Sequence, residues 1–485
     1  MRNHIIHKLN VDINVPDIAT ARRIYRDTGE LLNDMVLPRL EEKLQGLMTG
    51  EEYYRVDKIT IDLQFDSETE FEKKLPVVAA AQLGKKLLDV KSATSEGGRG
   101  SLLSPGSKEA LIKISETEKR WEIFLYFLET GRLPWYASSD IQWLDEGSLT
   151  LAIADIQSTD QELPGVTNTK GTRHFYKDSF DRVIRKTADA ATRLARQFTS
   201  SFILSLVKQF YNYHPVWVDM HVAKVKKEFP DDQQLVQQLL VNVIVFFNGS
   251  NDLKKSNTDL LQSLADKFIS DKKKQEGQLL DENNATIYPV PGAINDEQRK
   301  DLNDNKEGKL KKLIADDEEG IYVSHAGLVL LHSFLPGFFD ELGLLDNKQF
   351  KNEQYRQKAI HLLYYLATGE RNPYEYDLLM EKYLCGLPLD EPVERFVTLT
   401  KEEEEESEGL LKAIIEHWKV LKNTSPEGLR EGFLYRNGKL VTGHDHRLLV
   451  ESNSIDVLLE QLPWGYSIIR LSWMEKILYV DWVAQ

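Results

Sequence analysis

Cysteine is almost absent from this sequence. Cys385 is the single cysteine among 485 residues, so no disulfide can form within the chain. This usage fits folding in a reducing compartment. Long apolar runs are absent as well: the longest, at 239–247, is interrupted by Asn242 and is far shorter than the ~20 residues of a membrane-spanning helix. The N-terminus alternates polar and apolar residues and lacks the apolar segment of a secretory signal, so we expect a cytoplasmic protein that does not bind a membrane.

An excess of basic charge is also lacking. The formal net charge is −16, although 28% of the residues are charged and 41% are hydrophobic, as in ordinary globular proteins. A negative surface disfavours nucleic acid and anionic lipid, which both need basic side chains. It favours a basic or polar protein partner. The length predicts about two to four domains.

Catalytic signatures are missing too. The sequence has no phosphate-binding loop, no nucleophile elbow and no H-E-x-x-H motif, and the glycines at 97–100 stand in a linker. His444 and His446 flank Asp445 and would share one face of a strand, where they could bind a metal, but a polar hairpin tip beside Gly443 is the commoner arrangement. Cys385 lies in an apolar helix, which favours a buried structural residue. We therefore expect no catalytic residue, no metal and no cofactor.

The patterns predict an α+β fold that is mostly helical. Apolar residues alternate over 4–15 and 53–65, which predicts strands. A helix from Asp17 to about residue 48, kinked or split at Pro38, and a second helix over about 68–90 complete a β-α-β-α module.

The remaining chain divides by composition. Of residues 271–320, 22 are charged and one is aromatic. Such a stretch cannot bury much apolar surface, so it is a linker, a solvated helix or a plain surface insertion. The predicted parts are a β-α-β-α N-terminal module at 1–90, a flexible linker at 91–117, a helical region at 118–250, a charged linker at 251–320, a helical core domain at 321–430, and a C-terminal module of β-hairpins and a helix at 431–485.

Two short stretches beyond residue 400 predict local structure. Asn437-Gly438 predicts a turn between 433–436 and the following strand. Glu402–Glu406 predicts the exposed first turn of a helix that continues past residue 410.

The end of the chain, 462–482, is rich in tryptophan. It could be a binding face, a membrane anchor or a buried strand pair; its four charged residues disfavour the anchor. We predict a hairpin packed on a helix over 455–462, with one Trp left exposed as a partner contact. Three tryptophans of this module are candidate partner contacts or structural residues: Trp464, Trp473 and Trp482. Trp135, in the GRLPWYA stretch, is a fourth candidate.

Several collinear stretches resemble one family. They are NHIIHKLNVDINV at the start, RVDKITIDL, GRLPWYA, and the segments 321–346, 357–371, 374–388, 410–440 and 462–482. Together they resemble the contractile injection system tape measure family of bacterial phage-tail-like particles. The family tends to carry Asn where this chain has His325, and Pro where it has Ser472.

The resemblance implies a structural assembly protein that sets the length of the inner tube and sheath. Its expected partners are the tube, baseplate or cap components, with several copies per particle. It is expected in the bacterial cytoplasm during assembly and then in the particle lumen. As helix, residues 91–320 would reach ~350 Å. The alternative is a cytoplasmic assembly chaperone or adaptor that does not stay in the particle.

Overall fold

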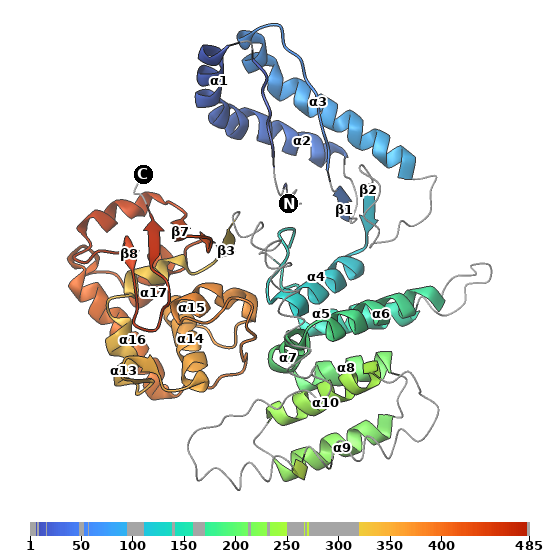
Figure 1. The fold of residues 1–485 in the computed structure, drawn as a ribbon, viewed down its shortest axis with the longest axis vertical. Coiled ribbons are helices and arrows are strands. Elements are labelled where there is room, and N and C mark those ends of the chain that lie inside the picture. The colour runs from blue at the N-terminus through green and yellow to red at the C-terminus, as the bar shows by residue number, and fades with distance from the viewer. Residues whose placement is uncertain are drawn as a thin grey trace. The chain divides into compact units, whose positions relative to one another are not determined.

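The computed structural model divides the chain into two compact units: Met1–Phe124 with Pro134–Asp155, and Leu125–Leu133 with Ile156–Gln485. Each unit is described by itself (Figure 1). The structure describes residues 6, 9–15, 17–47, 53–56, 58–94, 111–137, 141–158, 170–211, 215–229, 233–249, 266, 269–270 and 320–482. The predicted charged linker at 251–320 therefore lies almost entirely outside the described residues.

The first unit begins with a helix that is split near Pro38, as predicted. Helix α1 (Ile18–Leu31) passes through a π-helical turn, η1 (Leu32–Val36), into α2 (Leu37–Leu47). Because Pro38 cannot donate to the carbonyl of Asp34 and its ring clashes with it, the widened turn accommodates the proline. Asp17 caps α1, since its Oδ1 accepts from the Thr20 amide at 2.8 Å.

Helix α3 (Glu68–Thr94) packs on this pair of helices. Its apolar face and theirs form a small core. The buried members are Ile24, Val36, Leu40, Phe71, Leu75, Ala79 and Ala80.

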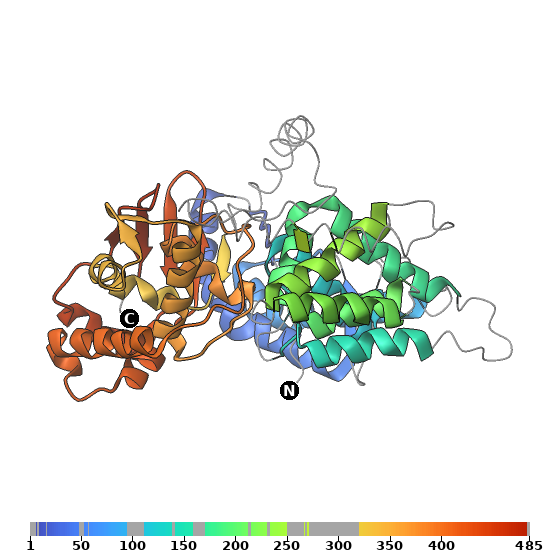
Figure 2. The same cartoon turned by 90° about the horizontal axis from the view of Figure 1, so that it is seen from below.

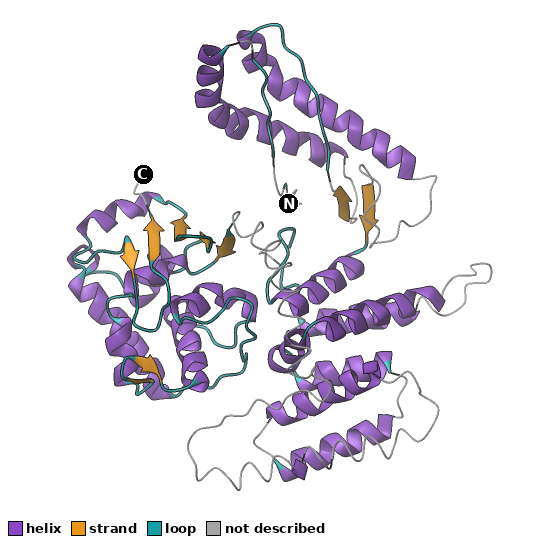
Figure 3. Ribbon diagram, viewed as in Figure 1, coloured by secondary structure: helices purple, strands orange, loops and turns teal. Residues whose placement is uncertain are grey.

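Where the structure describes the N-terminal module, its strands differ from the predicted β-α-β-α order; residues 4, 5, 7 and 8 of the first predicted strand lie outside the described residues. Strand β1 spans only Tyr53–Val56, and its antiparallel partner is β2 (Leu111–Ile114), inside the stretch predicted as linker. Residues 9–15 and 58–65 belong to no ladder among the described residues, and Figure 3 draws them as loop. Exposure alternates along 58–65, whereas residues 9–14 are all exposed. Alternation reports which side chains face a core, whereas a strand also needs a backbone partner, which periodicity cannot supply.

Two further helices follow β2. They are α4 (Glu116–Thr130), which ends at Gly131 with φ +72°, and α5 (Glu146–Ser158). This left-handed glycine ends α4. In the first unit, Trp143 is fully buried and Lys119 Nζ lies 4.6 Å from its ring centroid.

The second unit opens with the predicted helical region. Its helices are α6 (Lys170–Lys186), α7 (Ala188–Gln197), α8 (Ser200–Phe210), α9 (Pro215–Glu228) and α10 (Gln233–Gly249). The side chains of Thr187 and Thr199 cap α7 and α8 by accepting from the third amide beyond them. Helix α10 packs against α7 and α8 (Figures 1 and 2).

The C-terminal part, residues 320–482, is built on a five-stranded sheet in the order β3-β6-β7-β9-β8 (Figure 3). The strands are β3 (Ile321–Val323), β6 (Gly438–Val441), β7 (His446–Val450), β8 (Ile468–Ile469) and β9 (Leu478–Asp481). The β7–β9 pair is parallel and the other pairs are antiparallel. A separate small hairpin joins β4 (Leu345–Asp346) to β5 (Gln349–Phe350).

Helices surround this sheet. They are η2 (Ala326–Leu331), α13 (Leu335–Glu341), α14 (Glu353–Thr368), η3 (Glu375–Leu378), α15 (Leu379–Leu384), α16 (Lys401–His417), η4 (Lys419–Leu421), α17 (Pro426–Leu429), η5 (Arg430–Leu434) and η6 (Ser454–Gln461). The acidic run at 402–406 opens α16 as predicted. Thr400 and Glu403 form a capping box there.

One apolar core extends from Val323 to Trp482. The predicted boundary after residue 430 falls inside this core, because β3 pairs with β6 across more than 100 residues of sequence. The two strands of the predicted terminal hairpin are β8 and β9, and they pair antiparallel. The mostly helical α+β class is confirmed.

The predicted turn at Asn437-Gly438 is wrong. The connection between β6 and β7 lies at 442–445, and Gly438 is the first residue of β6. A Cβ added to Gly438 would lie 2.7 Å from the Ala326 Cβ, so this glycine permits close packing of the sheet on η2 rather than a turn.

Candidate functional site

The densest buried polar cluster lies where α7 meets the segment 375–395. Arg193 on α7, Glu375 on η3 and Lys382 on α15 are at most 1% exposed. Arg193 Nε donates to both carboxylate oxygens of Glu375, at 3.2 and 3.1 Å. Lys382 Nζ donates to Glu375 Oε1 at 3.0 Å. One carboxylate thus serves two buried cations.

Backbone carbonyls satisfy the remaining donors of both cations. Arg193 Nη1 donates to the carbonyls of Leu128 and Glu129 at 3.1 Å, and its Nη2 donates to that of Asp390. Lys382 Nζ donates to the carbonyls of Leu389 and Glu391, at 2.7 and 2.6 Å. Burial lowers the pKa of Lys382, and the Glu375 carboxylate opposes this shift.

A second set of hydrogen bonds extends this contact. Gln197 Nε2 donates to the Val393 carbonyl at 2.7 Å, and Gln197 Oε1 accepts from the Glu375 amide at 2.8 Å. The Arg395 amide donates to the Arg196 carbonyl at 3.2 Å, and the Arg395 guanidinium lies 3.6 Å from the Tyr374 ring centroid. We call the set Arg193, Gln197, Glu375, Lys382 and loop 389–395 the α7 junction.

Gly131 allows the end of α4 to join the α7 junction. A Cβ there would lie 2.4 Å from Glu375 Oε1 and 2.9 Å from Arg193 Nε. The junction therefore draws together four sequence segments, near residues 130, 193, 375 and 390. Its charged groups form their hydrogen bonds with other groups of the same chain, and these bonds hold the four segments together.

A second buried cluster centres on His325. Its Nδ1 lies 2.6 Å from Glu381 Oε1, and both side chains are at most 2% exposed. Burial lowers the pKa of His325, but the charges of Glu381 and Asp377 outweigh burial and raise it. Burial also raises the pKa of Asp377, to about 7. This cluster can exchange protons near neutral pH.

The other candidates from the sequence do not form a reactive site. Cys385 is fully buried and burial raises the pKa of its thiol, so it lacks thiolate character. His444 is 99% exposed, whereas His446 Nδ1 lies 2.8 Å from the Tyr383 hydroxyl, so the two histidines do not converge. Within the described residues, no three or more His, Cys, Asp or Glu side chains gather as a metal site would require.

The structure places the candidate tryptophans in different surroundings. Trp473 and Trp482 are buried; their Nε1 atoms donate to the Leu384 carbonyl at 2.8 Å and to Asp456 Oδ2 at 2.9 Å. Trp464 is half-buried and donates to the Leu330 carbonyl at 2.9 Å. Trp135, in the first unit, is 46% exposed. A partner could reach Trp135 most easily.

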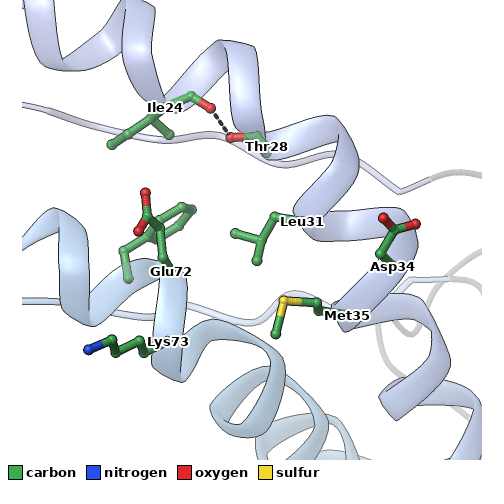
Figure 4. A pocket seen from close by; sticks show the side chains of 8 residues that line it. Ile24, Thr28, Leu31, Asp34, Met35, Glu72 and Lys73 are labelled. Carbon is green, nitrogen blue, oxygen red and sulfur yellow. Dashed lines mark hydrogen bonds between the residues drawn. The ribbon is translucent and has the colours of Figure 1, made fainter.

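A shallow groove of about 440 Å³ lies on the first unit between α1, η1 and α3 (Figure 4). Its lining is mainly apolar, with Ile24, Leu31 and Met35 among its walls and Asp34, Glu72 and Lys73 around it. No polar side chains converge on one point within it in Figure 4. The groove therefore lacks the arrangement of an active site.

The α7 junction was not predicted from the sequence. Its one local signal is that Arg193 and Gln197 stand in the same helical stripe as Ala190 and Leu194, where apolar residues are expected. A polar residue in an apolar stripe indicates a buried partner, but it does not identify Glu375, 182 positions away.

Fold and site together define a mostly helical α+β protein in which buried charges hold distant segments of the chain together. A family model described as contractile injection system tape measure protein matches residues 3–482, so the chain belongs to that family. No curated protein and no solved structure matches the chain. Among the described residues, no helix has the length and apolar character needed to cross a bilayer.

Proposed function

We propose that this chain sets the length of the tube and sheath during assembly of a contractile injection particle. The family match over residues 3–482 carries the proposal. The folded ends would bind particle components, and the charged stretch at 271–320 would act as the spacer between them. The protein would assemble in the bacterial cytoplasm and occupy the particle lumen.

Two features of the chain bear on this arrangement. The α1–α3 core and the core of residues 323–482 each bury their own apolar residues, so either end can remain folded while the spacer is extended. The α7 junction holds the helical region and the C-terminal part together through buried ion pairs, so the spacer between these two parts can be extended only once this junction opens. Trp135 is an exposed aromatic residue of the first unit, on which a partner could pack.

The test is to lengthen the spacer. Inserting 20 residues of similar composition within 271–320 should lengthen the particles by about 30 Å if the insert is helical and by up to about 70 Å if it is extended. Electron micrographs of purified particles measure this directly. The matched control inserts the same 20 residues at 442–445, the exposed turn between β6 and β7, and should leave the length unchanged.

Unchanged particles after spacer insertion would reject the length-setting role. Mass spectrometry of intact particles then separates the alternative, since an assembly chaperone or adaptor would be missing from them. A retained chain with no effect on length would instead indicate a fixed structural component.

A further inference from the structure

Residues 58–65 have the properties of an edge strand. The segment is extended, and its side chains alternate between exposed polar residues and half-buried apolar ones. Leu63 and Phe65 pack against the core that α1, η1, α2 and α3 share. One face of the segment is therefore covered by helices, and the other carries Lys58, Thr60, Asp62 and Gln64.

The backbone of this segment joins no ladder in the part of the chain that the structure describes. Among the described residues, no backbone–backbone hydrogen bond joins 58–65 to another segment, although β1 immediately before it is paired with β2. The Thr60 carbonyl accepts from Lys86 Nζ. Successive residues of an extended chain direct their backbone N–H and C=O groups to opposite edges. The N–H and C=O groups of Ile59 and Ile61 therefore point to the edge opposite the Thr60–Lys86 hydrogen bond. Such an edge is a template for another strand.

The order of residues specifies the partner. Lys58-Ile59-Thr60-Ile61-Asp62 is self-complementary when two copies run antiparallel about Thr60. Lys58 then lies opposite Asp62 of the second copy at both ends, Ile59 lies opposite Ile61, and Thr60 lies opposite itself. We propose that two copies of this chain pair through residues 58–62, in a two-fold symmetric antiparallel ladder that joins their N-terminal units.

The same register predicts a specific geometry at the two-fold axis. Since Ile59 and Ile61 supply the ladder hydrogen bonds, the Thr60 pair is a non-hydrogen-bonded pair, with Cα atoms about 4.5 Å apart. That separation lies within the range of disulfides. The proposal does not depend on the length-setting role, because the pairing is a property of the purified chain.

A single cysteine tests the register. In the full-length chain, Thr60→Cys should give a disulfide-linked dimer under mild oxidation, seen on a non-reducing gel. The matched control is Gln64→Cys, equally exposed on the same face of the same strand. In the proposed pairing the two cysteines introduced at position 64 would be roughly 26 Å apart, so this variant should stay unlinked. The native Cys385 is fully buried and should not contribute.

Charge exchange tests the pairing without a cross-link. Lys58→Asp places like charges opposite each other twice, and so does Asp62→Lys, so each variant alone should self-associate roughly tenfold more weakly or worse. An equal mixture of the two variants restores both attractive pairs and should form mixed dimers. The double variant K58D/D62K should dimerise like the parent. Sedimentation velocity measures all four samples.

Two results would overturn the inference. One is that the parent chain is monomeric and Thr60→Cys forms no cross-link. This result is expected if a different protein occupies this edge, or if residues 102–110 extend β2 along it. The other is an equal loss of association in K58D, D62K and their mixture, which would show that the charges do not face each other.

Discussion

The α7 junction provides the sharpest test of how this protein is held together. Glu375→Gln keeps the shape of the side chain but removes the carboxylate that Arg193 and Lys382 share. Both cations would remain buried, with backbone carbonyls as their acceptors. Removing one partner of a buried ion pair costs about 3–5 kcal/mol, most of it the penalty for the charge left behind.

The measurement should report on this contact alone, since a chain with several folded parts does not unfold in one step. Hydrogen exchange of the α7 amides gives the local opening free energy. In Glu375→Gln the protection should fall by roughly a hundredfold or more. Adding Arg193→Met removes one uncompensated cation. The loss of opening free energy in the double variant should therefore be smaller than the sum of the losses in the two single variants.

Arg196 supplies the control for this prediction. It lies one turn further along α7, is half-buried, and donates from Nη1 to the Pro392 carbonyl at 2.6 Å. Arg196→Met should cost about 1 kcal/mol, the value of one ordinary hydrogen bond. If Glu375→Gln costs no more than Arg196→Met, the reasoning about uncompensated charge fails and the junction is held by packing alone.

The remaining predictions concern pH and the C-terminal tryptophans. Burial lowers the pKa of His361 to about 4, compared with about 6.5 in the unfolded chain. The free energy of unfolding is therefore highest above pH 6.5 and falls by about 3 kcal/mol in all as pH decreases towards 4. His361→Gln should flatten this part of a pH–stability profile. Asp377, whose pKa is raised to about 7, should have the opposite effect on the pH dependence of stability, because the folded state retains a proton that the unfolded chain has released. Stability should therefore fall as pH rises toward 7, and Asp377→Asn should abolish that slope. An unchanged profile would contradict the burial of this carboxyl group. Trp473→Ala or Trp482→Ala should destabilise the C-terminal core by about 3–5 kcal/mol in denaturant unfolding. Trp135→Ala should change stability by less than about 1 kcal/mol. A stable core in the first two variants would make those residues contacts to a partner instead.

Local features of the fold could be predicted from the sequence because their causes are local. The helix start at Asp17, the break near Pro38 and the acidic first turn of α16 each depend on neighbours within one helical turn. The family could also be identified, because the order of several short stretches is itself a property of the chain.

Tertiary structure decided everything that joins distant residues. The sequence alone determined that residues 58–65 alternate, but only the fold shows that their apolar side packs on helices while, among the described residues, their backbone pairs with no other strand. Gly438 reads as a turn in sequence and serves as a point of close packing in space. Arg193 and Glu375 meet only because the chain folds back on itself, since burial and charge pairing depend on position in space, which periodicity along one segment does not encode.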